Sequence, residues 1–199
     1  MIDQWFFVFA VIVTLLIPGP TNALLASSAY QQGIYKTSLF IPAEFLGYVY
    51  AMSLWALFIH LCHPIWPYLL DILHVASAIY VFWLAFHLWK ASHLRVHNQK
   101  NTSIRPKQLF FVTLKNPKAV LFAVGIFPQN TWESVENCFW TYLVFLAVLV
   151  PTSLFWMFFG KAILDNKSTQ SKADVLYKGS ALLLMIGVLP VIFKFFMIA

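Results

Sequence analysis

Two proline-containing interruptions inside long apolar segments constrain the fold of this chain more than any other feature. One interruption is Pro18-Gly19-Pro20-Thr21-Asn22, and the other is Asn116-Pro117-Lys118-Ala119. Proline removes a backbone donor and clashes with the preceding turn, so each motif predicts a broken helix. Inside a membrane, broken backbone is tolerated only where protein or a water-lined cavity covers it. Paired breaks in the two halves of a chain therefore indicate a transporter binding site.

Composition identifies the environment of these segments. The chain is 61% hydrophobic and only 10% charged, with a mean hydropathy of +0.76. A soluble domain carries about 25% charged residues, so this chain has too few to cover a water-facing surface. We therefore predict an all-α integral membrane protein. The N-terminus lacks the basic region of a signal peptide, so we expect the first apolar segment to be retained.

A membrane span needs roughly 20 mostly apolar residues. The predicted spans cover approximately residues 4–27, 36–61, 69–89, 108–127, 139–160 and 175–197. Pro151 and Pro190 predict kinks in the last two. Lys115 and Lys118 interrupt the fourth segment, so a chain of only five spans is the alternative.

Charged residues between the segments orient the bundle. The linker after the third segment is basic and contains no acidic residue, and the loop after the fifth contains four lysines. Glu133 and Glu136 lie in a loop without Lys or Arg. The positive-inside rule then predicts six spans with both termini outside, because five spans would place the two basic loops on opposite faces. These basic residues act as topology signals, which argues against binding of nucleic acid despite a net charge of +6.

The predicted spans divide into two groups of three within a single membrane domain, residues 1–199. Residues 1–92 form the first group, residues 93–105 a basic cytoplasmic linker, and residues 106–199 the second group. Each group opens with a broken helix. Because three is odd, the second group would insert in the opposite orientation, as in the inverted three-plus-three repeats of many secondary transporters.

The broken helices supply the first candidate binding residues. A new helix is predicted after Pro20 and after Pro117, with Asn116 as a cap. A helix N-terminus carries partial positive charge and unpaired amides, so two facing termini would suit a carboxylate. Kinks satisfied by neighbouring helices, without a ligand, are the alternative. Lys118 would hold the carboxylate or a structural partner, or its side chain would snorkel to the headgroups.

Glu44 is the one acidic residue well inside an apolar segment. It could receive a substrate ammonium group, relay a proton or pair with Lys118, or it could lie at the inner interface near Lys36. Tyr48 lies on the same helical face. The predicted substrate-binding residues are Pro18, Gly19, Pro20, Thr21, Asn22, Glu44, Tyr48, Asn116, Pro117 and Lys118.

Other chemistry is poorly supported by the sequence. His60, Cys62 and His63 are closely spaced, but a structural zinc site needs four ligands and no further cluster is evident. Cys62 and Cys138 are expected to be free thiols. No phosphate-binding loop, nucleophile elbow or pair of catalytic carboxylates occurs, so we predict neither an enzyme nor a cofactor.

Several motifs resemble the LysE/RhtB family of amino-acid exporters, the LysE-type translocators. They are Pro18 to Asn22, Gln32-Gly33, Ala76 to Tyr80, Leu114 to Phe122, Phe127-Pro128-Gln129, Lys178-Gly179 and Gly187. The resemblance covers essentially the whole chain. It implies a small multi-pass exporter of the bacterial cytoplasmic (inner) membrane that moves amino acids or related metabolites, with the proton as coupling ion.

Two alternatives stay open beside this reading. One is a metal or other ion exporter on the same scaffold, and the other is an accessory membrane subunit that does not transport. The expected partners are a small amino acid, the proton and membrane lipid, and the sequence leaves open whether the chain forms a homo-oligomer.

Overall fold

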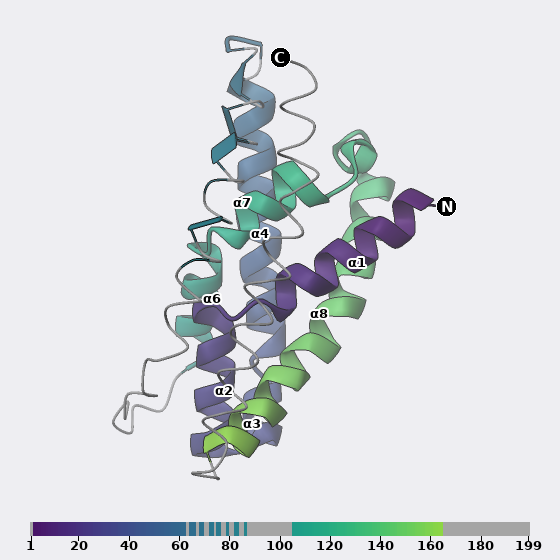
Figure 1. Cartoon of the computed structure of the whole chain (residues 1–199). Coiled ribbons are helices and arrows are strands. Elements are labelled where there is room, and N and C mark those ends of the chain that lie inside the picture. The colour runs from purple at the N-terminus through teal and green to yellow at the C-terminus, as the bar shows by residue number, and fades with distance from the viewer. Residues whose placement is uncertain are drawn as a thin grey trace.

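The computed structural model describes residues 2–62 and 105–164, together with residues 64–66, 68–69, 72–73, 75–76, 79, 82–83 and 86. Regular structure in these ranges is helical, and no strand occurs among them. The helices are α1 (Ile2–Leu16), α2 (Pro20–Gln32), α3 (Ile34–Ser38), α4 (Ile41–Cys62), α6 (Pro106–Leu114), α7 (Lys118–Leu121), the π-helical η1 (Phe122–Ile126), the 3-10 helix η2 (Gln129–Trp132) and α8 (Val135–Leu164) (Figure 1).

Two of these helical stretches are long and apolar enough to cross a membrane unaided, namely Ile34–Cys62 and Val135–Ala162. Two further pairs of helices pass the same test only when the two helices of a pair are counted as one span. Trp5–Leu16 and Pro20–Gln32 are bent by 60°, and Pro106–Leu114 and Lys118–Ile126 are bent by 56°. Both bends fall at the proline motifs, so the two predicted helix breaks are confirmed.

The two bent pairs run in opposite directions through the bundle. Helix α8 advances alongside α1 and α2, since Trp156 contacts the end of α1 and Gly160 contacts Ala26 in α2. The same helix is antiparallel to α4, since Tyr142 meets Ser53 near the end of α4. Helix α6 rises beside α4 toward the crossing point at the centre of the molecule (Figure 1).

Charged residues mark the two ends of this arrangement. Helix α3, with Lys36, lies beside the C-terminal end of α8, which carries Lys161 (Figure 1). Glu133 and Glu136 lie at the opposite end, where α8 begins. Lys36 and Lys161 are therefore separated from Glu133 and Glu136 along the bundle, as the loop charges predict.

Small residues let the helices approach closely at two points. A Cβ atom built on Gly47 would lie 2.8 Å from the Cβ of Thr113, where α4 meets α6. A Cβ atom on Gly160 would lie 2.5 Å from the main chain of Ala26, where α8 meets α2. Close packing of small residues is a usual means of helix association in membranes, where no hydrophobic effect drives it.

The predicted spans agree with these helices except at their ends. The first span continues to Gln32, and the fifth begins at Val135. Helix α8 continues through Pro151 as one helix, and the kink expected at this residue stays a prediction. The predicted sixth span and Pro190 lie outside the described residues, as does most of the third span.

Candidate functional site

The two helix breaks meet at the centre of the described structure. The side-chain nitrogen of Asn116 donates a hydrogen bond of 2.9 Å to the hydroxyl of Thr21, across 95 positions of sequence. The same amide lies 3.4 Å from the hydroxyl of Tyr48 in α4. Asn116 and Thr21 belong to different proline motifs, so their contact joins the two interruptions directly.

The first break is built as its sequence predicts. Gly19 is the N-cap of α2, and Pro20 occupies the first helical position, where its missing N–H costs nothing. The side-chain amide of Asn22 donates to the main-chain oxygens of Leu15 at 2.8 Å and Ile17 at 2.7 Å. Those oxygens have lost their helical donors because α1 ends at Leu16. Asn22 therefore satisfies the backbone that the break exposes.

The second break is also capped by its asparagine. Helix α7 begins at Lys118, and Pro117 before it already has helical angles of φ −62° and ψ −16°. The side-chain oxygen of Asn116 accepts from the main-chain N–H of Lys118 at 3.1 Å, which is the capping contact that the sequence predicts. An asparagine that bonds two residues ahead stabilises a turn by itself.

Lys118 points into the protein and not toward the headgroups. Its side chain is 3% exposed, and its Nζ atom donates a hydrogen bond of 2.6 Å to the main-chain oxygen of Ile17. A Cβ atom on Gly19 would lie 3.3 Å from both Cε and Nζ of Lys118, so the glycine provides the room for this side chain. The snorkelling alternative is therefore wrong, and the structural-partner alternative describes the observed contact.

Glu44 is buried as well, with an exposed fraction of 1%, so the shallow interfacial alternative is wrong. The hydroxyl of Ser153 in α8 donates to its Oε2 atom at 2.7 Å. The predicted direct pairing with Lys118 does not form, because each side chain has a different partner. The two groups are still close enough to interact electrostatically.

Sequence reasoning missed the partners that come from α8 and from the end of α1. Trp156 donates from Nε1 to the main-chain oxygen of Leu15 at 3.3 Å. Thr152 and Ser153 are adjacent polar residues inside an apolar span, directly after Pro151. This polar pair is the sequence feature that could have identified Ser153 as a partner. The sequence could not identify the main-chain oxygens of Leu15 and Ile17 as partners, because every residue carries a backbone carbonyl.

These contacts define the polar cluster, a buried group of side chains contributed by four helices, α2, α4, α7 and α8, and by one break. Its members are Thr21, Asn22, Glu44, Tyr48, Asn116, Lys118 and Ser153. Each is at most 4% exposed. Buried polar groups of this kind are costly unless they are paired, so their hydrogen bonds to one another and to the main chain stabilise the cluster.

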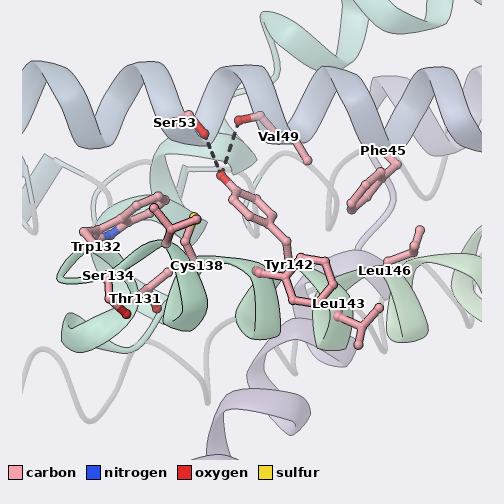
Figure 2. Close-up of a pocket in the computed structure, with 12 residues that line it drawn as sticks. Phe45, Val49, Ser53, Thr131, Trp132, Ser134, Cys138, Tyr142, Leu143 and Leu146 are labelled. Atoms are coloured by element: carbon pink, nitrogen blue, oxygen red, sulfur yellow. Dashed lines mark hydrogen bonds between the residues drawn. The ribbon is translucent and has the colours of Figure 1, made fainter.

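A cavity of about 660 Å³ lies elsewhere, between α4 and the beginning of α8. Figure 2 shows Ser53 and Val49 of α4 on one side and Tyr142 and Cys138 of α8 on the other. None of the ten predicted binding residues lines it. The cavity and the polar cluster are thus separate features.

Among the described residues, no group of three or more His, Cys, Asp or Glu side chains comes together. His60 is exposed, Cys62 and Cys138 are free thiols, and His63 lies outside the described residues.

Comparison with known proteins gives a family match over nearly the whole chain. Residues 12–198 match the family model described as LysE type translocator. A leucine efflux protein of Enterobacter sp. (strain 638) is 26% identical over 197 residues, covering 94% of this chain and 93% of that protein.

Two other relatives match over shorter stretches. A homoserine/homoserine lactone efflux protein of Salmonella typhi is 36% identical over 63 residues, or 30% of this chain and 31% of that protein. A cysteine/O-acetylserine efflux protein of Salmonella paratyphi A is 28% identical over 118 residues, or 57% of each chain. No solved structure matches the chain significantly.

Proposed function

Because the chain belongs to the LysE type translocator family, we propose that it is a secondary exporter of amino acids with small or apolar uncharged side chains. The relatives named for leucine, homoserine and cysteine or O-acetylserine efflux support this substrate class. The observation that carries the proposal is the meeting of two broken helices around buried Lys118 and Glu44. Ionisable residues inside a membrane protein are functional candidates by default.

The proposed binding mode uses the charges of a zwitterionic amino acid. The substrate carboxylate would take the place of the Ile17 oxygen at Nζ of Lys118, with the amides after Pro20 and Pro117 nearby. The substrate ammonium group would be received by Glu44. Tyr48, Thr21 and Asn22 would supply neutral hydrogen bonds. Binding would therefore exchange contacts within the polar cluster for contacts with the substrate.

Proton coupling is proposed for Glu44. Its carboxylate is buried and, among the described residues, accepts from the hydroxyl of Ser153, which can accept from a protonated acid as well as donate to a charged one. Exchange of a proton at this group would link export to the proton gradient.

The proposed topology has six spans, arranged as an inverted three-plus-three repeat in the bacterial inner membrane with both termini outside. The opposite directions of the two bent pairs support the inversion. The position of Lys36 and Lys161 at one end of the bundle, away from Glu133 and Glu136, supports the orientation.

Uptake of labelled leucine, homoserine and cysteine into inside-out membrane vesicles tests the proposal. An exporter should concentrate at least one of them in the vesicle lumen when the lumen is made acidic, and a proton uncoupler should abolish this accumulation. Vesicles without the protein provide the background. If no amino acid of this class enters above background, with or without a gradient, the proposed function is wrong.

A further inference from the structure

The cavity between α4 and α8 is open on one side, where Val135 and Phe139 are exposed, and its volume is in the range of small-molecule sites. Small-molecule sites usually occupy about 300–1,000 Å³, and this cavity measures about 660 Å³. Its lining is mostly apolar, with hydroxyl groups from Ser53, Thr131, Ser134 and Tyr142 and no charged side chain. The hydroxyl groups could hydrogen-bond the charged groups of an amino acid, and the apolar walls could contact its side chain.

A continuous set of aromatic rings separates this cavity from the polar cluster. We call it the aromatic cluster; its members are Tyr48, Phe122, Phe127, Trp132, Tyr142 and Phe145. At one end, Tyr48 belongs to both clusters, and its hydroxyl lies 3.4 Å from the side-chain nitrogen of Asn116. At the other end, Tyr142 and Trp132 line the cavity.

The rings between these ends are in direct contact. The ring centres of Tyr48 and Phe145 are 5.5 Å apart, and those of Phe145 and Phe127 are 5.8 Å apart. Phe127 then contacts Tyr142 at 5.7 Å and Trp132 at 5.9 Å. Edge-to-face and stacked rings at these distances attract one another, so the barrier is stable when closed.

The aromatic cluster includes a backbone segment suited to movement. Phe122 and Phe127 lie at the two ends of the π-helical turn η1, whose closing hydrogen bond joins the N–H of Phe127 to the oxygen of Phe122 at 2.9 Å. Such turns contain one residue more than an α-helical turn, are rare, and often mark functional positions. A change of this turn to α-helical pairing would displace Phe127 relative to Phe122 and open a gap between rings.

A hydrogen bond across the cavity also joins its two walls. The hydroxyl of Tyr142 in α8 lies 2.9 Å from the hydroxyl of Ser53 in α4, and it donates to the main-chain oxygen of Val49 at 3.3 Å (Figure 2). The ring of Tyr142 belongs to the barrier, so this bond ties the position of the barrier to the spacing of α4 and α8.

We propose that the cavity between α4 and α8 is the outer vestibule through which the exported amino acid leaves, and that the aromatic cluster is the gate that closes it off from the polar cluster. The proposal rests on the proposed function for the identity of the solute. It adds the exit path and the residues that block it in the closed state.

The natural cysteines allow a direct test of the vestibule. Cys138 lines the cavity, whereas Cys62 lies at the end of α4 and does not. In a Cys62→Ser chain in intact cells, a membrane-impermeant methanethiosulfonate reagent should label Cys138 from outside and reduce export at least tenfold. The Cys62→Ser, Cys138→Ser chain should be insensitive to the reagent. Labelling of Cys138 without loss of export, or access from the cytoplasmic side only, would overturn the vestibule.

The gate can be tested without measuring transport. In a chain lacking both natural cysteines, Thr21→Cys places a thiol in the polar cluster, where it should stay unlabelled from outside. Adding Phe127→Ala, or the milder Phe127→Leu if the first variant does not fold, should raise its labelling rate at least tenfold. Phe139→Ala provides a matched control, since Phe139 lines the cavity but is 61% exposed and lies outside the gate.

The outcomes separate this inference from the proposed function. If the thiol of Thr21→Cys is labelled at the same rate in the chain with Phe127 and in the chain with Phe127 replaced, the proposed gate is wrong. This conclusion holds whether or not the protein exports amino acids. Absence of amino-acid transport combined with the expected labelling pattern would contradict only the proposed function.

Discussion

The side-chain nitrogen of Lys118 donates a 2.6 Å hydrogen bond to the main-chain oxygen of Ile17, which lies 101 positions earlier in the chain. The oxygen of Ile17 can accept this bond because it has no helical N–H donor, since α1 ends at Leu16 and α2 begins only at Pro20. The carbonyl end of a helix carries partial negative charge, which favours a cation nearby. The lysine of one break therefore stabilises the exposed backbone of the other.

Replacing Lys118 by methionine tests this relationship. Lys118→Met keeps the length of the side chain but removes the donor, while Ile17 keeps its bond from Asn22. We expect the free energy of unfolding to fall by only about 0.5–1.5 kcal/mol, the usual net value of one hydrogen bond. Export should fall at least tenfold, because the proposed carboxylate partner is lost.

Lys115→Met is the matched control for this variant, since Lys115 is exposed and lies three positions earlier. Thermal unfolding in detergent and amino-acid uptake into inside-out vesicles provide the two measurements. Equal loss of export in both variants would contradict a specific role for Lys118.

The contact between the two breaks can be measured by a double-mutant cycle. Asn116→Ala and Thr21→Val each remove one partner of the 2.9 Å hydrogen bond. We expect the two changes to be less than additive, with an interaction of about 0.5–1.5 kcal/mol in the free energy of unfolding. Chemical unfolding in mixed micelles supplies the four values.

A second cycle controls for general effects of the threonine change. Within the described part of the chain, Thr152 bonds only to carbonyls of its own helix, so Thr21→Val combined with Thr152→Val should be additive within about 0.3–0.5 kcal/mol. Additivity in the Asn116 cycle as well would show that the breaks are not coupled energetically.

Glu44→Gln tests the proposed proton coupling. Glutamine retains a side-chain oxygen that can accept from Ser153, so we expect the variant to fold and to exchange substrate across the membrane at equal pH. It should lose the accumulation that an imposed pH gradient drives, because an amide cannot exchange a proton in this range. Glu133→Gln, at an exposed position, should behave as the unmodified chain. Gradient-driven accumulation at the normal level in Glu44→Gln would refute the coupling role.

Substitutions of Gly160 and Gly125 should have different effects on stability, because Gly160 lies where α8 contacts α2 and Gly125 does not. Gly160→Ala would place a Cβ atom 2.5 Å from the main chain of Ala26, so the helices must separate and the protein should lose about 1–3 kcal/mol of stability. Gly125→Ala meets only a side-chain atom of Leu121 at 3.6 Å.

The second change should leave the melting temperature unchanged or raise it, because alanine favours a helix over glycine. Thermal unfolding of the two variants in the same detergent decides the matter. A smaller loss of stability for Gly160→Ala than for Gly125→Ala would mean that α2 and α8 do not pack as described.

The helix breaks could be predicted because proline acts on the residues next to it in sequence. The burial of Glu44 and Lys118 was foreseeable only as one of several alternatives, since sequence does not show how far a long side chain lies from the membrane surface. Ser153 could not be assigned to Glu44, because that contact depends on which face of α8 meets α4. The capping contact of Asn116 could be predicted for the same reason, because it reaches only two residues along the chain.

The reliance of Lys118 on the first broken helix has a consequence for biogenesis. Proteins are synthesised from the N-terminus, so the carbonyl of Ile17 is already in place when the second interrupted segment leaves the ribosome. A fragment that contained only the second half would enter the bilayer with an ammonium group and no partner for it. Efficient insertion of that half therefore calls for the first half to be present, either in the same polypeptide or supplied as a separate co-expressed piece.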